Sequence, residues 1–175
     1  KKKQLVPYTD GFAIGNGWVW RIPLWHRMGM GYVYSDKYID DEGALEEFKQ
    51  HLKEHNQFFE DQKFHKIKFK AGIYDRIWVK NVAAIGLSAG FIEPLESNGL
   101  FSVHMFLVRL LRAIDRDKDN HMVSEFDKNG YNWACRTIFD GFAQFVAMHY
   151  SMSHRDDTEY WRDVGRRNYC DVDKS

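Results

Sequence analysis

Residues 86–100 read Gly-Leu-Ser-Ala-Gly-Phe-Ile-Glu-Pro-Leu-Glu-Ser-Asn-Gly-Leu, and they join short apolar runs to a long helix. The preceding run at 81–86, Asn-Val-Ala-Ala-Ile-Gly, ends in glycine and predicts a buried strand. Ser97 and Asn98 are favoured helix N-cap residues, and an apolar helical run follows over 98–114. Because this helix is apolar on nearly all sides, we expect it to be buried.

The same segment contains groups that are capable of chemistry. Backbone amides at a helix start carry partial positive charge, so the amides of Asn98 and Gly99 predict an anion site. Glu96 stands beside them as a candidate base or electrostatic partner. The small residues at 86–90 let the backbone approach a bulky ligand closely. An ordinary capped helix, with Glu93 and Glu96 solvated, explains these residues equally well.

A second constellation is Gly17-Trp18-Val19-Trp20-Arg21-Ile22-Pro23. Strand alternation places Trp18 and Trp20 on one face, where they wall a pocket or fill a core. For two large aromatic side chains taken alone, the core is the more common place.

The remaining pattern predicts an α+β fold, with mixed strands in the first half and a helix-rich second half. Glu42 to His55 carries Leu45, Phe48 and Leu52 at helical spacing after an acidic start. The other expected strands lie within 12–25 and at 30–34, 64–69 and 73–80, and the other expected helices at 133–150 and 158–164.

Composition excludes several function classes. The 175 residues have a formal net charge of zero, which gives no electrostatic case for nucleic acid or an anionic membrane. The longest apolar run, 100–111, is shorter than the roughly 20 residues that span a bilayer. Two cysteines, Cys135 and Cys170, lack metal-type spacing, and we expect a cytoplasmic protein.

We expect no metal site. The acidic run Asp115–Asp119 resembles the start of a calcium loop, but Asn120 replaces the required glycine and Phe126 the bidentate glutamate. His149, His154 and Asp156 match no common metal-ligand spacing.

Taken together, these stretches resemble the flavin-dependent halogenases of the tryptophan-halogenase type. Residues 17–23 fit the family's Gly-Trp-x-Trp-x-Ile-Pro signature in full. Residues 29–35 resemble the segment that follows it, and 80–97 resemble the motif that ends in Glu-Pro-Leu-Glu-Ser. Weaker matches at 149–150 and 160–161 extend the resemblance over most of the chain, which is identified as a central to C-terminal portion of such an enzyme.

The resemblance implies an enzyme that uses reduced FAD, O2 and a halide to form hypohalous acid and halogenate an electron-rich aromatic substrate. It implies a separate flavin reductase as partner, and it leaves a homodimer open. Glu96 is the implied catalytic glutamate, and the amides of Asn98 and Gly99 are the implied halide site. The implied FAD-binding residues are Leu87, Ser88, Ala89, Gly90, Pro94 and Leu100. The implied pocket wall consists of Trp18, Trp20, Ile22 and Pro23.

The chain also departs from the family pattern. The Gly-x-Gly-x-x-Gly dinucleotide fingerprint is absent, and the family's catalytic lysine falls in the same unmatched region, so no lysine here is assigned its role. Asn98 stands where threonine is usual. We therefore expect 1–100 to be part of a flavin-binding domain, 101–175 to form a continuous helical region on the substrate side, and the isolated chain to be inactive. A hydroxylating flavin monooxygenase relative and a non-catalytic domain of the same fold are the alternatives.

Overall fold

The computed structural model describes residues 7–57, 59–116, 119 and 122–166, which fall into two compact units. The first unit combines Lys1–Lys66 with His149–Ser175, and the second is Ile67–Met148. Cys170 and most of the loop after Arg116 lie outside the described residues. This division by compactness differs from the functional division expected at residue 100, which stays a prediction.

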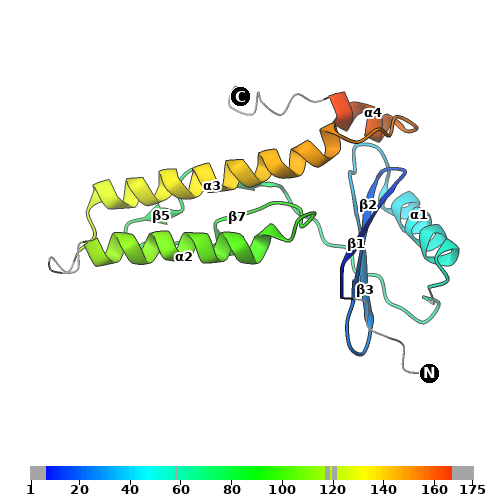
Figure 1. Ribbon diagram of the computed structural model, residues 1–175, viewed down its shortest axis with the longest axis horizontal. Helices are drawn as coiled ribbons and strands as arrows, with labels where there is room; N and C mark the ends of the chain where they lie inside the picture. Colours follow the sequence, from blue (N-terminus) through cyan, green and yellow to red (C-terminus); the bar gives the residue numbers. More distant parts are fainter. Residues whose placement is uncertain (1–6, 58, 117–118, 120–121, 167–175) are drawn as a thin grey trace. The chain divides into compact units, whose positions relative to one another are not determined.

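The first unit contains a three-stranded antiparallel sheet in the order β1-β2-β3 (Figure 1). Its strands are β1 (Asp10–Ile14), β2 (Gly17–Pro23) and β3 (Met28–Tyr34). Gly15 and Asn16 form the two-residue turn between β1 and β2, a loop length that favours glycine and asparagine. The pairing places Ala13 opposite Trp18 and Trp20 opposite Gly31.

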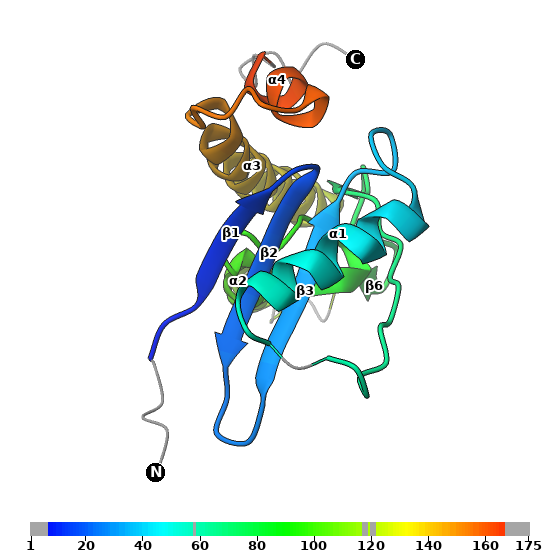
Figure 2. The same cartoon turned by 90° about the vertical axis from the view of Figure 1, so that its right-hand side faces the viewer.

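Helix α1 (Asp41–Glu54) covers one face of this sheet, as Figure 2 shows. The Asp40 carboxylate caps the helix by accepting a 2.8 Å hydrogen bond from the Gly43 amide, and two acidic residues follow in the first turn. The apolar face expected from the sequence is confirmed, since Phe48 and Leu52 pack with the fully buried Val19 of β2.

A polar contact also ties α1 to the sheet. The Glu47 carboxylate accepts hydrogen bonds from Tyr32 Oη at 2.8 Å and Asn16 Nδ2 at 3.2 Å. Burial and the neighbouring Glu47 carboxylate raise the pKa of Tyr32, so this phenol remains a donor. The β1–β2 turn is thus linked to the middle of α1.

The second unit is built on two long helices, α2 (Asn98–Arg116) and α3 (Glu125–Ser151), which run side by side in Figure 1. Four two-residue strands pair with each other: β4 (Gly72–Ile73) with β7 (Gly90–Phe91), and β5 (Trp78–Val79) with β6 (Val82–Ala83). The core of this unit joins the β5 segment, Ala89 and both helices, with these buried members: Ile77, Trp78, Ala89, Phe106, Ala113, Tyr131, Cys135 and Phe139.

Asn132 of α3 holds the β5 segment through its side-chain amide. Its Oδ1 accepts from the amides of Ile77 and Trp78, both at 2.8 Å, and its Nδ2 donates to the Trp78 carbonyl at 3.2 Å. Such bonds satisfy backbone groups that two-residue strands leave unpaired. The neighbouring thiol of Cys135 is buried, and burial raises its pKa to about 11, so this cysteine is an unreactive core residue.

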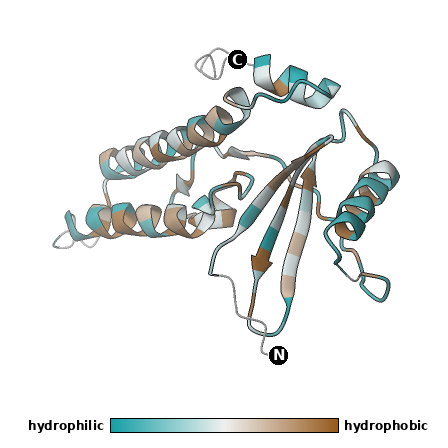
Figure 3. Ribbon diagram, turned by 45° about the vertical axis from the view of Figure 1, so that its right-hand side comes forward, coloured by the Kyte–Doolittle hydropathy of each residue, from teal (hydrophilic) through white to brown (hydrophobic). Residues whose placement is uncertain are grey.

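Three expectations about residues 64–114 are wrong in detail. Residues 64–69 form no strand, and every one of them is exposed. The run 81–86 forms only the two-residue β6, in which Val82 is exposed. Helix α2 is not buried all round: its inner residues Phe106 and Ala113 are covered, whereas Leu100, Leu107, Leu111 and Ile114 are exposed. Only one face of α2 therefore meets the core of this unit. Figure 3 shows hydrophobic and hydrophilic residues interspersed along the helices.

The expected helix at 133–150 begins earlier than predicted, at Glu125, because Ser124 caps it. Ser124 Oγ accepts from the Asp127 amide at 3.0 Å and donates to the Asp127 carboxylate at 2.6 Å. The last helix, α4 (Glu159–Arg166), forms close to its expected place. Across the described ranges, no helix has the length and apolar content needed to cross a bilayer.

Candidate functional site

The segment 86–100 begins with a tight turn against α2. Gly86 has φ +64°, and a Cβ there would lie 2.7 Å from Val103 Cγ2, so both conformation and space require glycine. The short 3-10 helix η1 (Gly86–Ser88) follows and packs against α2. This packing brings the turn next to the helix start, as the sequence predicted for a strand–turn–helix arrangement.

Several of the candidate cofactor-binding residues serve the local fold. Ser88 Oγ accepts from the Ile85 amide at 3.1 Å and donates to the Ile85 carbonyl at 2.9 Å. Ala89 is fully buried, and Gly90 must lack a side chain because a Cβ would lie 2.6 Å from the Gly72 carbonyl oxygen on β4. These three residues therefore shape the turn.

Two apolar side chains of the segment are exposed to solvent. Leu87 on η1 is 79% exposed, and Leu100 in the first turn of α2 is 85% exposed. The two leucines are thus exposed apolar side chains on two elements that pack together. Pro94 is also exposed, at the start of the turn that leads to α2.

The start of α2 is arranged by an unusual backbone conformation. The Ser97 amide donates to the Pro94 carbonyl at 3.1 Å, and Ser97 itself has φ +56°, a left-handed conformation that is rare outside glycine. The next amides, those of Asn98 and Gly99, precede the first helical hydrogen bond, so no carbonyl of α2 reaches them. Space around Gly99 is open, since a Cβ there would meet nothing within 4 Å.

The side chain of Asn98 strengthens the case for an anion at this helix start. Among the described residues, its Nδ2 is buried and has no hydrogen-bond partner in the structure. A buried donor without an acceptor costs about 1–3 kcal/mol, and a bound anion would satisfy it. Glu96, which is exposed, lies two residues before this donor.

The candidate pocket wall lies in the other unit. Trp18 is buried and Trp20 half-buried on the face of β2 opposite Val19, as alternation predicts. The Trp20 indole lies over Gly31 of β3, where a Cβ would be 2.6 Å from Trp20 Nε1. Ile22 is exposed and Pro23 half-buried at the end of the strand.

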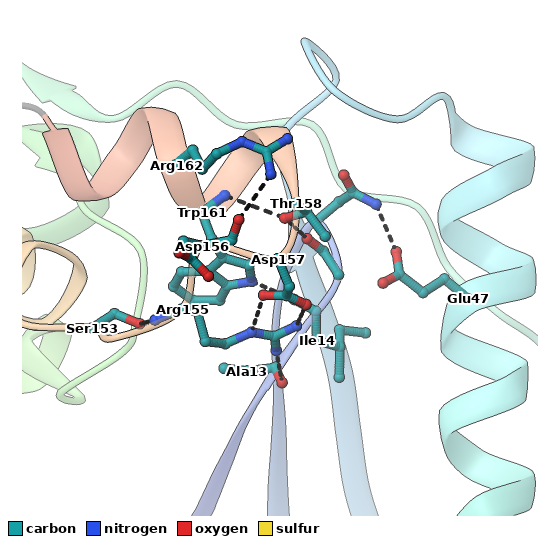
Figure 4. Close-up of polar contacts among 12 residues, drawn as sticks. Ala13, Ile14, Glu47, Ser153, Arg155, Asp156, Asp157, Thr158, Trp161 and Arg162 are labelled. Atoms are coloured by element: carbon teal, nitrogen blue, oxygen red, sulfur yellow. Dashed lines mark hydrogen bonds and ion pairs between the residues drawn. The ribbon is translucent and has the colours of Figure 1, made fainter.

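Sequence reasoning missed one group of contacts around β1. Side chains from residues 155–161 donate hydrogen bonds to the β1–β2 hairpin (Figure 4). The signal was present only as the weak family match at Tyr160 and Trp161. A local sequence pattern does not predict which distant backbone carbonyl a side chain will bind.

Comparisons with known proteins match nearly the whole chain. Residues 1–173 match the family model described as tryptophan halogenase. The tryptophan 7-halogenase KtzQ of Kutzneria sp. (strain 744) is 35% identical over 162 residues, which are 93% of this chain and 29% of KtzQ.

Solved structures agree with the family model. The VirX1 apo structure is 41% identical with a TM-score of 0.86, and the match covers 96% of this chain and 31% of VirX1. Xcc4156, a flavin-dependent halogenase from Xanthomonas campestris, is 34% identical with a TM-score of 0.80, covering 94% of this chain and 31% of Xcc4156. The chain thus spans less than a third of the length of these proteins. The family match spans residues 1–173 of this chain, and the part of a complete family member to which they correspond stays a prediction.

Proposed function

Because the chain belongs to the tryptophan halogenase family, we propose that it forms part of a flavin-dependent halogenase acting on an electron-rich aromatic compound. The proposal includes reduced FAD from a separate flavin reductase, O2 and a halide as reactants, and a cytoplasmic location. Residues 1–100 would serve the flavin side and 101–175 the substrate side. The single observation that carries the proposal lies at the start of α2. The side-chain amide of Asn98 has no hydrogen-bond partner among the described residues, and it belongs to the same helix start as backbone amides that no carbonyl of α2 reaches.

The residues present fit a flavin and a halide. Leu87 and Leu100 offer apolar surface on adjacent elements, and the open space at Gly99 leaves the helix amides accessible. Bound reduced flavin would supply two electrons that activate O2, and O2 would be the oxidant that converts halide to hypohalous acid and water. The turn residues Ser88, Ala89, Gly90 and Pro94 would support that surface through the backbone.

The chain's own part in the chemistry is to hold an anion and to move a proton. The amides of Asn98 and Gly99 would hold the halide, and Asn98 Nδ2 would add a third donor where the family usually has threonine. Glu96 would accept the ring proton that leaves as the carbon–halogen bond forms, or orient the electrophile. Trp18 and Trp20, with Ile22 and Pro23, would form the wall of the pocket.

A pair of substitutions at Gly99 tests the halide site in the chain itself. Gly99→Pro removes one amide hydrogen in the first helical turn, a region where proline is tolerated. Gly99→Ala keeps the amide, and its Cβ meets open space, so it is the matched control. The measurement is the 35Cl NMR line width of chloride titrated with each protein, with far-UV circular dichroism to verify helix content.

We expect the wild type and Gly99→Ala to broaden the chloride line and Gly99→Pro to broaden it several-fold less. Equal broadening by all three proteins would exclude chloride binding at these amides.

A further inference from the structure

Three side chains near the end of the described chain bind three consecutive carbonyls near its beginning. Arg155 Nη1 donates to the Ala13 carbonyl, Trp161 Nε1 to the Ile14 carbonyl at 2.6 Å, and Thr158 Oγ1 to the Gly15 carbonyl at 2.7 Å. Figure 4 shows these contacts at the end of β1. We call Arg155, Thr158 and Trp161 the clasp.

The clasp is itself held rigidly. The Arg155 guanidinium makes a bidentate pair with Asp157, at 2.9 and 2.5 Å, and lies 5.2 Å from the centre of the Trp161 ring. Thr158 Oγ1 also accepts from the Trp161 amide at 3.3 Å, which caps the start of α4. One hydroxyl therefore links the helix start to the hairpin turn.

Aromatic packing anchors the helix that carries the clasp. The Trp161 ring centre lies 6.0 Å from that of Tyr150 and 5.1 Å from that of Tyr160, and both tyrosines are buried. Tyr38, from the segment after β3, packs edge-on against Tyr160 at 5.4 Å. Aromatic contacts from α3 and from the segment after β3 therefore hold the helix that carries Trp161 in place.

The bound carbonyls lie directly beside the tryptophan motif. Ala13 is the pairing partner of Trp18, and Ile14 pairs with Gly17, so two contacts of the clasp lie one strand away from the motif at 17–23, and the third is to Gly15 in the turn. Strand β1 is an edge strand of this sheet, so its unpaired side is open to side chains from elsewhere in the unit. Pairing with β2 sets the register of β1, and the clasp adds three side-chain donors at the last two residues of β1 and at Gly15 of the turn.

We propose that Arg155, Thr158 and Trp161 are positioning residues that set the placement of Trp18 and Trp20. The inference rests on the proposed function for its catalytic meaning, because Trp18 and Trp20 would wall the route between hypohalous acid and the aromatic substrate. Productive geometry in such sites is held to about 0.5 Å, so a small shift of β2 suffices to misdirect the acid.

The first test uses the chain itself and needs no activity. The six tryptophans at 18, 20, 25, 78, 133 and 161 are replaced by 5-fluorotryptophan, and 19F NMR spectra are compared. Trp161→Phe removes the donor but keeps an aromatic ring, and Thr158→Val removes the hydroxyl at nearly constant shape. Trp133→Phe, at an exposed position on α3, and Thr158→Ser, which keeps the hydroxyl, are the matched controls.

We expect Trp161→Phe and Thr158→Val to shift or broaden the resonances of Trp18 and Trp20 while those of Trp78 and Trp133 stay in place. Thr158→Ser should restore the wild-type positions. Unchanged Trp18 and Trp20 resonances would overturn the proposal. A shift of every resonance would overturn it too, because the clasp would then be a general requirement for folding.

The second test uses the complete halogenase that carries the chain. An added scavenger captures the hypohalous acid that escapes, and the ratio of halogenated product to captured acid is measured. Trp161→Phe should lower this ratio at least threefold and leave the total amount of halide oxidised unchanged. An unaltered ratio would contradict the positioning role. If the wild type oxidises no halide, the proposed function has failed, and the NMR comparison still decides whether the clasp positions β2.

Discussion

The indole ring of Trp20 on β2 lies against Gly31 on β3, its direct partner in the sheet. Gly29, two residues before Gly31, borders the same ring, since a Cβ there would be 3.4 Å from Trp20 Cζ3. Gly29 and Gly31 of β3 therefore leave the space that the Trp20 ring of β2 occupies. Two of the three stretches that carry the family resemblance, 17–23 and 29–35, thus form one structural feature.

Gly31→Ala should displace the Trp20 ring. The added Cβ would overlap the indole, and overpacking of this kind costs about 1–3 kcal/mol. Urea unfolding followed by circular dichroism measures the loss. Gly11→Ala is the control, because a Cβ at Gly11 in β1 meets nothing within 4 Å; equal stability of the two variants would show that Trp20 can move aside freely.

The stability of the first unit should decrease in acid because of His51. This residue is 5% exposed, its Nε2 has no partner among the described residues, and its ring centre lies 4.2 Å from that of His55. Burial, then the neighbouring His55, lowers the pKa of His51; Arg21 acts in the same direction, and Glu54 opposes it.

The sign of the pH effect follows from that lowered pKa. Between the folded pKa and the ordinary value near 6.5, the unfolded chain binds more protons than the folded chain. The free energy of unfolding should therefore be highest above pH 6.5 and fall as the pH drops through that window. Urea unfolding at pH 7.5, 6.5 and 5.5 measures this slope, and His51→Phe should reduce it; a slope that the substitution leaves unchanged would assign the effect to other groups.

The two faces of α2 should respond differently to substitution. Phe106→Ala on the covered face should cost about 3–5 kcal/mol, because it opens a cavity in the core of the second unit. Leu107→Gln and Leu111→Gln on the exposed face should each change the free energy of unfolding by less than about 0.5 kcal/mol. Losses of several kcal/mol in the glutamine variants would show that this face is covered in solution.

Much of the first unit could be predicted from local sequence. The strands expected within 12–25 and at 30–34 and the helix expected at 42–55 formed close to those places, because alternation and an acidic helix start are signals within a few residues. The turn at Gly15 and Asn16 and the Asp40 cap were not predicted. The second unit was harder to predict, because β4 pairs with β7 across 17 to 19 positions and Asn132 reaches β5 across more than 50. The lysine-rich run at 64–69 alternates like a strand but finds no partner strand among the described residues.

The candidate site shows the same limit. A helix start near Glu96 could be predicted from Ser97 and Asn98, but the left-handed Ser97 and the buried, unpartnered amide of Asn98 are properties of packing. The clasp on β1 was not predictable, because its donors lie 142 to 147 positions from the carbonyls they bind.

Glu96→Gln tests the proposed proton acceptor. In the complete halogenase, the substitution keeps the shape of the side chain and removes its basic carboxylate. We expect halogenation to fall by about 100-fold or more, since positioned acid–base groups contribute roughly 10²–10⁴ in rate, while flavin affinity stays within about twofold. Turnover at the wild-type rate would show that Glu96 has another role.

The central claim is tested most directly by a halide-dependent product. The complete protein that carries this chain is supplied with FAD, a flavin reductase, O2 and a panel of electron-rich aromatic compounds, with bromide, chloride or neither. We predict a product that carries the isotope pattern of the added halogen in mass spectrometry and that disappears without halide. A hydroxylated product that forms equally well without halide would indicate a monooxygenase instead, and no product under any condition would contradict an enzymatic role.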